Sequence, residues 1–335
     1  MSTSPTLAAI PQPKEDEEYN KICEEHNRLI ESLPKGHGWM VKHLYNYNGF
    51  WLKQENVKNN MLLHTYFKSE PTDIVLASFM KSGTTWLKAL MFSTISRDHY
   101  TFSDHYLLEN SPQSTFPLID FECYPISEFT NLPAPRLFAT HYAYTLLPKC
   151  MTSCKLVYVC RDPKDVLISK WIFMNKLRSK DLPPLTLNEA FELFCNGVSE
   201  YGPFWEHVLS YWRASMESPD KIFFLKYEDL KMQPKVVLRN LAVFMGKPFT
   251  MEEEEKGVVD EIVKLCSFEF LSNLDVNKKG SLKVDSIVEL ENQVFLRKGE
   301  IGDWKNYLNQ EMKERIDRIS DAKMKGSGVI LGARV

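Results

Sequence analysis

The feature that most constrains this chain is the stretch of residues 73–97. Residues 73–80 form a short apolar run with β-branched side chains, which predicts a buried strand. Apolar side chains at positions 86, 87, 90, 91 and 95 follow, and this spacing predicts a helix. Between the two elements lies a tight turn with the sequence Lys81-Ser82-Gly83-Thr84-Thr85-Trp86.

A strand that enters a helix through such a turn presents free backbone N–H groups beyond its end, where the helix dipole adds partial positive charge. Lys81 adds a full charge, and the side chains of Ser82, Thr84 and Thr85 add hydroxyl donors. The stretch therefore predicts a P-loop-like cradle for a phosphate or a similar anion. Because the chain lacks the Gly-x-x-x-x-Gly-Lys-[Ser/Thr] pattern, an ordinary strand-to-helix connection remains an alternative at this point.

The composition is that of a soluble globular protein, with 44% hydrophobic and 25% charged residues in a chain of 335. The net charge of -3 gives no reason to expect binding to nucleic acid or to a membrane surface. No apolar run approaches the ~20 residues that are needed to span a bilayer. Residues 1–18 lack the pattern of a signal or transit peptide, so we interpret them as a flexible tail and expect a cytoplasmic protein.

The chain contains seven cysteines, and we expect them to be reduced because the number is odd and no secretion signal is apparent. Cys150, Cys154 and Cys160 lie close together in the sequence but lack the paired Cys-x-x-Cys spacing of a zinc site. We therefore expect no metal at this position.

Strand and helix patterns alternate along the chain. Apolar runs at residues 136–141, 155–160 and 221–227 predict three further strands, and residues 163–177 show the spacing of a helix. The alternation predicts an α/β fold with a central, mainly parallel sheet that is flanked by helices. Since no Pro/Gly/Ser-rich linker divides the chain, we expect residues 19–335 to form a single domain.

Polar side chains occur at or just beyond the carboxyl ends of the predicted strands, where α/β proteins bind ligands: Lys81, His141, Arg161 and Tyr227. Together with Arg297–Lys298 these residues could supply three cationic contributions to a polyanionic ligand. A nucleoside triphosphate would also require Mg²⁺ ligands, and the strand ends do not offer the expected carboxylate. A metal-free anhydride donor with phosphates at two positions fits better, and an ATP/Mg-dependent P-loop kinase is the alternative.

His141 is the natural candidate for a general base, because an imidazole pKa near 6.5 suits proton abstraction near neutral pH. The same histidine could equally be a core residue satisfied by the backbone, and Arg161 alone could form a surface ion pair. A Cys–His hydrolase has little support, since no cysteine lies in a nucleophile-elbow context. A binder of adenosine bisphosphate without catalytic activity is a further alternative.

Several motifs together resemble the cytosolic sulfotransferase family, in the family's order and spacing, across residues 70–330. They are Lys81-Ser-Gly-Thr-Thr-Trp86, Thr140-His141, Arg161 with Ser169, Tyr227-Glu-Asp and Arg297-Lys-Gly-x-x-Gly-Asp-Trp-Lys305. The segment Tyr201-Gly-Pro-Phe-Trp205 and the Gly326-Ser-Gly ending are similar to the plant branch, which includes flavonol sulfotransferases.

The resemblance implies 3′-phosphoadenosine 5′-phosphosulfate (PAPS) as the donor, with adenosine 3′,5′-bisphosphate as its product and no metal. Lys81, Ser82, Gly83, Thr84, Thr85 and Trp86 would hold the 5′-phosphosulfate, with Lys81 bridging to the leaving oxygen. The residues implied for the 3′-phosphate are Arg161, Ser169, Arg297, Lys298 and Gly299. Trp86 and Tyr227 would flank the adenine, and His141 would take the proton of the acceptor hydroxyl.

The resemblance also implies a small, largely apolar acceptor with a hydroxyl group, and we favour a flavonol or another phenolic. The alternatives are other plant acceptors: a desulfoglucosinolate, a brassinosteroid or hydroxyjasmonate. Five aromatic residues are candidates for the acceptor pocket, although each could equally be a core residue: Phe79, Tyr142, Tyr144, Phe204 and Trp205.

The chain departs from the family pattern at three places near the predicted site. Met80 occupies the position where proline usually precedes the lysine, and Ala139 replaces a lysine that many animal members carry. Tyr142–Ala143 replaces a Leu-Pro-like pair, which we expect to alter the wall of the acceptor pocket.

The dimerisation motif near the carboxyl terminus is also altered. Lys305 and Glu314 are kept, but Asn309–Gln310 replaces the Thr-Val centre of the motif. We therefore expect a monomer or a weak homodimer.

Overall fold

The computed structural model describes residues 17–121, 129, 131–283 and 289–332. Its central sheet has four parallel strands in the order β5-β4-β6-β7. These strands are β4 (Ile74–Ser78), β5 (Leu137–Thr140), β6 (Lys155–Cys160) and β7 (Ile222–Lys226). Each observed strand lies inside the range that the sequence predicted, and the predicted α/β fold with a parallel central sheet is confirmed.

The sheet is covered on both faces, because successive side chains of a strand point to opposite sides. In β4, Val75 and Ala77 belong to one core cluster, whereas Ile74 and Leu76 belong to the other. The first cluster includes side chains of α2 (Gln54–Tyr66), α4 (Pro163–Leu177) and α6 (Phe204–Glu217). The second includes side chains of α3 (Thr84–Ile95), α8 (Pro234–Phe244) and α10 (Val258–Leu265).

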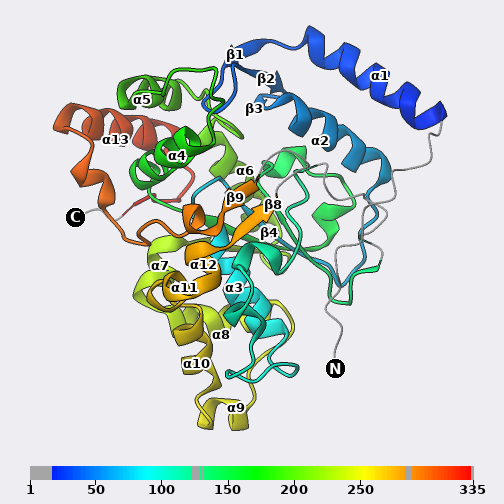
Figure 1. The fold of residues 1–335 in the computed structure, drawn as a ribbon, viewed down its shortest axis with the longest axis vertical. Helices are drawn as coiled ribbons and strands as arrows, with labels where there is room; N and C mark the ends of the chain where they lie inside the picture. Colours follow the sequence, from blue (N-terminus) through cyan, green and yellow to red (C-terminus); the bar gives the residue numbers. More distant parts are fainter. Residues whose placement is uncertain (1–16, 122–128, 130, 284–288, 333–335) are drawn as a thin grey trace.

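The other helices pack around these layers (Figure 1). They are α1 (Glu17–Ser32), α5 (Leu187–Cys195), α7 (Tyr227–Met232), α9 (Met251–Glu255), α11 (Phe268–Asn273), α12 (Asp275–Lys279) and α13 (Gln310–Met324). The predicted tail, residues 1–18, lies outside the described residues except for Glu17 and Glu18, with which α1 begins. Among the described residues, no helix is long and apolar enough to cross a membrane.

Two small antiparallel sheets were not among the predicted elements. The first contains β1 (Lys35–His37), β2 (His43–Tyr47) and β3 (Phe50–Leu52), and the second pairs β8 (Ser281–Lys283) with β9 (Glu289–Glu291). The first is attached to the segment before α6, because the N–H of Tyr201 donates to the carbonyl of Trp51 (2.7 Å).

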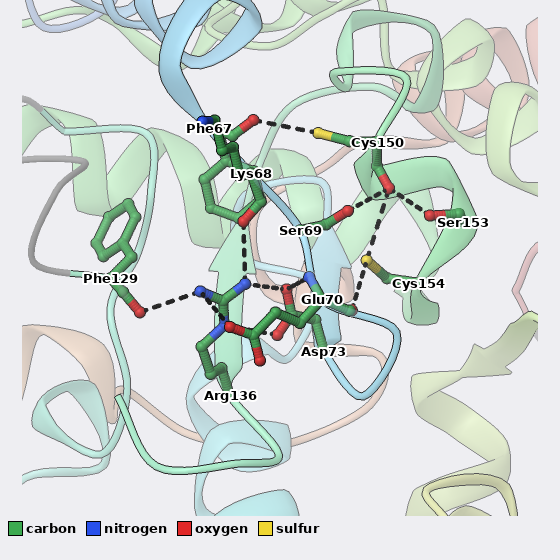
Figure 2. A network of polar contacts seen from close by, with 10 residues as sticks. All are labelled: Phe67, Lys68, Ser69, Glu70, Asp73, Phe129, Arg136, Cys150, Ser153 and Cys154. Carbon is green, nitrogen blue, oxygen red and sulfur yellow. Dashed lines mark hydrogen bonds and ion pairs between the residues drawn. The ribbon is translucent and has the colours of Figure 1, made fainter. Parts of the chain in front are cut away.

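A buried ion pair holds the amino-terminal edge of the central sheet (Figure 2). Arg136, just before β5, donates from Nε and Nη2 to the two carboxylate oxygens of Asp73, just before β4, at 2.7 and 2.6 Å. The same guanidinium donates to the carbonyls of Lys68 (3.0 Å) and Phe129 (3.2 Å). This network fixes the starts of two neighbouring strands, at the edge of the sheet opposite to their carboxyl ends.

The cysteines of the described part of the chain are free thiols, as predicted, while Cys123 lies outside the described residues. Cys150 and Cys154 lie beside the Arg136 network and donate to backbone carbonyls (Figure 2). Burial raises the pKa of the Cys154 thiol to about 11, so this sulfur is protonated and unreactive at neutral pH.

Candidate active site at the carboxyl edge of the sheet

A cavity of about 240 Å³ lies at the carboxyl edge of the central sheet. The structure brings nearly all of the predicted site residues to its wall: Lys81, Gly83, Thr84, Thr85, Trp86, His141, Arg161, Ser169, Tyr227, Arg297, Lys298 and Gly299. Ser82 is the exception, since its side chain is fully buried and does not line the cavity. Residues that are far apart in the sequence therefore meet at one place.

The turn between β4 and α3 has a backbone that few residues tolerate. Lys81 has a φ of 69° and Gly83 a φ of 125°, and α3 begins at the next residue. A Cβ atom at position 83 would lie 2.9 Å from Cδ2 of Tyr227, so a glycine is required by space as well as by φ. This close approach lets the N-terminus of α3, with its free N–H groups, face the cavity.

Lys81 lies among other positive charges. Its Nζ is 4.1 Å from the centroid of the Phe173 ring, on α4. Burial lowers the pKa of Lys81 to about 7, and the charges of Arg297, Arg161 and Lys176 contribute to the same shift. A bound anion would act in the opposite sense, because a negative charge favours the protonated ammonium. The electrostatics of the site are thus those of an anion-binding pocket.

Four buried atoms in this region that can donate a hydrogen bond have no partner among the described residues. They are Trp86 Nε1, Arg161 Nε, Arg297 Nε and Ser82 Oγ. Leaving a buried donor unpaired costs about 1–3 kcal/mol, and such atoms are rare in folded proteins. Because three of them are N–H donors on residues that line one cavity, a ligand rich in acceptor oxygens fits here.

Arg161 is held in place from several sides. Its Nη2 donates to the carbonyl of Glu300 and lies 3.4 Å from Oδ2 of Asp165, one turn later on α4. The guanidinium carbon is 4.4 Å from the centroid of the Tyr227 ring, and the hydroxyl of Tyr227 donates to the carbonyl of Gly299 (3.0 Å). These contacts fix Arg161 and leave its Nε free to bind a ligand.

Two acidic residues that were not among the predicted site residues position the last cationic segment, residues 297–304, and one of them, Asp303, lies inside the motif of residues 297–305. Asp303 pairs with Arg297 (Nη1 to Oδ2, 2.6 Å) and with Lys298 (Nζ to Oδ1, 2.6 Å). Asp165 accepts hydrogen bonds from two backbone N–H groups of the same segment, at 2.8 and 3.1 Å. Both carboxylates are nearly fully buried, and they anchor the segment to α4.

His141 is held by one ring nitrogen. Its Nδ1 donates to the carbonyl of Ser78 (2.8 Å), which leaves Nε2 unprotonated and able to accept a proton. The hydroxyl of Ser78 is 2.7 Å from that of Thr84, so the histidine is linked to the start of α3. Burial lowers the pKa of His141 to about 3, and the bond to Ser78 opposes this shift. The imidazole is therefore neutral at physiological pH.

Asp120 fixes the backbone at His141 by hydrogen bonds, and it was not among the predicted site residues. Its two carboxylate oxygens accept from the Thr140 hydroxyl (2.6 Å) and from the backbone N–H of His141 (2.7 Å). Burial raises the pKa of Asp120 to about 7, and the hydrogen bond from Thr140 opposes this shift. The signal that could have found it is a single acid inside the apolar run of residues 116–121.

For the five aromatic candidates for the acceptor pocket, the structure favours the alternative that they are core residues. Phe79, Tyr142, Phe204 and Trp205 are buried in the core, and none of them, nor Tyr144, lines the cavity. Phe79 and Phe204, for example, pack edge to face with ring centroids 5.1 Å apart. Helical and strand spacing identified them as apolar but could not tell which apolar side chains face a cavity. The apolar side chains that do line it include Met40, Leu118, Phe121, Phe173, Tyr201 and Phe295.

Comparison with known proteins gives a match between residues 71–328 and the family model of the sulfotransferase domain. Cytosolic sulfotransferase 15 of Arabidopsis thaliana is 41% identical over 326 residues, which cover 95% of this chain and 89% of that protein. Flavonol 4′-sulfotransferase of Flaveria chlorifolia is 43% identical over 290 residues, covering 86% and 90% of the two chains. The chain belongs to the sulfotransferase family.

Solved structures agree with this assignment. An Arabidopsis thaliana protein described as a sulphotransferase has a TM-score of 0.72 and 35% identity, over 97% of this chain and 100% of that one. A mouse sulfotransferase complexed with PAP, which is adenosine 3′,5′-bisphosphate, has a TM-score of 0.64 and 26% identity, over 85% and 95%. The predicted sulfotransferase fold and enzyme class are therefore confirmed.

Proposed function

We propose that this sulfotransferase moves the sulfuryl group of PAPS to a hydroxyl of a small, largely apolar acceptor in the cytoplasm, without a metal. The observation that carries the proposal is the set of three unpartnered N–H donors on Trp86, Arg161 and Arg297 around one cavity, found within the described part of the chain. PAPS offers acceptor oxygens at two phosphate positions, which suits donors spread over α3, the connection between β6 and α4, and the segment of residues 297–304. The mouse relative with bound PAP supports the same donor.

In this proposal the two ends of the donor bind to different elements. Lys81 and the N–H groups at the start of α3 hold the 5′-phosphosulfate, where a helix N-terminus stabilises negative charge. Arg161, Ser169 and the segment that begins at Arg297 hold the 3′-phosphate. The rings of Trp86 and Tyr227, whose centroids are 5.6 Å apart, contact the adenine.

The proposed transfer needs one base and one cationic stabiliser. The acceptor oxygen forms a bond to sulfur while the bond from sulfur to the 5′-phosphate oxygen breaks, and the electron pair stays on that phosphate oxygen. Nε2 of His141 takes the acceptor proton, and Lys81 stabilises the charge that develops on the leaving oxygen. The negative charges of the donor would raise the pKa of His141 and so make it a stronger base when the donor is bound.

A flavonol or another phenolic is the acceptor that we favour. Phe121, Phe173, Tyr201 and Phe295 give the cavity an aromatic wall that suits a flat ring. The Flaveria chlorifolia relative named for a flavonol supports this choice. Other plant acceptors, namely a desulfoglucosinolate, a brassinosteroid or hydroxyjasmonate, are the alternatives, and we expect no nucleic-acid or membrane partner.

The test is an acceptor screen with PAPS that carries ³⁵S in the sulfuryl group. Phenolics, brassinosteroids, desulfoglucosinolates and hydroxyjasmonate are compared at equal concentration, and transfer of the label to a flavonol with the highest kcat/KM is the expected result. A higher kcat/KM for another class would reject the phenolic acceptor and keep the enzyme class. No transfer to any acceptor by a protein that binds PAP would favour a catalytically silent binder.

A further inference from the structure

Lys88 is a buried lysine on α3 that the proposed mechanism does not use. Its side chain is 1% exposed, yet it contributes to the wall of the cavity. The ammonium donates to the backbone carbonyls of Gln113 (2.8 Å) and Phe116 (2.6 Å), and it lies 5.0 Å from the centroid of the Phe116 ring. Two of its three N–H bonds are thus satisfied by neutral groups.

Lys170 shows how the same chain treats another buried lysine. Lys170 is also fully buried, but its Nζ lies 2.9 Å from the Glu200 carboxylate, so its charge is paired. Lys88 has no such carboxylate within ion-pair distance among the described residues, and burial alone lowers its pKa to about 7. Carbonyl oxygens satisfy donors but do not cancel a charge, and a buried charge without a counter-ion is costly. The pattern points to a counter-ion that comes from a ligand.

The position of Lys88 indicates where this ligand charge lies. Lys88 follows Thr84 by four residues on α3, so the two side chains share one face of the helix. Thr84 contacts Ser78, and the carbonyl of Ser78 holds Nδ1 of His141. The positive charge of Lys88 is also one of the causes that lower the pKa of His141. Lys88 therefore belongs to the part of the cavity where the proposed base acts.

We propose that Lys88 is a second catalytic cation, which supplies the counter-charge for an anionic oxygen at the reacting centre beside His141. The inference rests on the proposed sulfuryl transfer. Two sources can provide this oxygen: the sulfuryl group itself, or the acceptor hydroxyl as it loses its proton. In both cases the ammonium of Lys88, on α3, is the positive charge that faces the anionic oxygen. It is separate from Lys81, which lies in the turn before α3.

The test compares Lys88→Met, which keeps the length of the side chain and removes the charge, with Lys88→Arg, which keeps the charge. The methionine variant should lower kcat by about 10-fold to 100-fold, the usual value of a hydrogen bond to a charged group, and arginine should restore part of the loss. Lys53→Met is the matched control, because Lys53 lines the same cavity, is only half-buried, and contacts the Phe121 ring at 5.5 Å. Its effect on kcat should be smaller.

Folding is followed by the rise in melting temperature with PAP, which lacks the sulfuryl group and should still bind. Should the methionine variant be unstable, Lys88→Gln keeps N–H donors for the two carbonyls without the charge. If the variant loses more affinity for PAPS than for PAP, each measured against wild type, Lys88 contacts the sulfuryl oxygens. If the affinities for PAPS and PAP change equally, and kcat falls more for an aliphatic alcohol than for an acidic phenol, Lys88 contacts the acceptor oxygen.

A folded Lys88→Met or Lys88→Gln variant with wild-type kcat would overturn the inference. An equal loss of kcat in Lys88→Met and Lys53→Met would also overturn it, since the removal of any positive charge near the cavity would then explain the effect. These results are distinct from failure of the proposed function, in which the wild-type protein itself transfers no label to any acceptor.

Discussion

The two ring nitrogens of His141 have different tasks, because Nδ1 is engaged with the carbonyl of Ser78 and Nε2 is left to accept a proton. We predict that His141→Ala lowers kcat by about 10²-fold to 10⁴-fold, the contribution expected of a general base. Donor binding should be retained, since none of the groups proposed to hold the phosphates is changed. A folded variant with near-normal turnover and normal PAP binding would show that His141 is structural.

The same residue predicts the form of the pH profile. Burial lowers the pKa of His141 to about 3, so the free enzyme keeps a neutral imidazole when the pH falls through the ordinary histidine range. We therefore expect kcat/KM for the donor to show no loss that depends on His141 with a midpoint near pH 6.5, the ordinary pKa of histidine. A loss at that pH that disappears in His141→Ala would mean that the imidazole titrates normally.

Arg161 gives a second prediction at the level of a single side chain. Its unpartnered Nε is proposed to bind the 3′-phosphate, so Arg161→Ala should weaken PAP binding by about 1.5–3 kcal/mol. Adenosine 5′-monophosphate, which lacks the 3′-phosphate, should lose much less affinity in the same variant. Equal losses for both ligands in a calorimetric titration would instead assign Arg161 to the packing of Tyr227 and residues 297–304.

At the scale of elements, the turn between β4 and α3 depends on Gly83. An alanine there would require a φ of 125° and would place its Cβ 2.9 Å from the Tyr227 ring. We predict that Gly83→Ala destabilises the protein by more than the roughly 1–3 kcal/mol of backbone strain, and that it weakens PAP binding because Tyr227 must move. Gly257→Ala is the control, since Gly257 has a φ of 74° and a Cβ added there would meet nothing within 4 Å beyond its own chain neighbours.

The comparison of these two variants separates strain from contact. Gly257→Ala should lower the free energy of unfolding without a change in PAP affinity. If both variants lose the same stability and neither loses affinity, the approach of Tyr227 to the turn has no role in donor binding.

The sequence predicted the elements better than it predicted the cavity wall. The four strands of the central sheet and the residues at their carboxyl ends could be found because strand length and strand ends leave a local pattern. Asp120 and Asp165 do not lie at strand ends, and their roles depend on contacts in the folded protein that the spacing of strands and helices does not reveal. For aromatic residues such as Phe79 and Phe204 the sequence left pocket and core open, because packing in three dimensions decides which side chains face a cavity.

At the scale of the whole molecule, the two edges of the sheet differ in how their charges are compensated. At the amino edge the buried guanidinium of Arg136 is matched by Asp73, and no ligand is needed (Figure 2). At the carboxyl edge Lys81 and Lys88 have pKa values lowered to about 7, with burial as the main cause. An excess of buried positive charge at one edge means that the folded state as a whole should be stabilised by a polyanion.

This contrast predicts which ligand raises the melting temperature. PAP should do so without added metal, and at a hundredfold excess over its Kd the stabilisation by mass action is about 2.7 kcal/mol. ATP with Mg²⁺ should stabilise less, because its charge lies in one triphosphate chain and leaves Arg161 and Arg297 without a 3′-phosphate. Differential scanning fluorimetry with PAP, ATP–Mg²⁺ and a metal chelator makes the comparison. Equal or greater stabilisation by ATP–Mg²⁺, lost on addition of the chelator, would favour the kinase alternative over a PAPS-dependent enzyme.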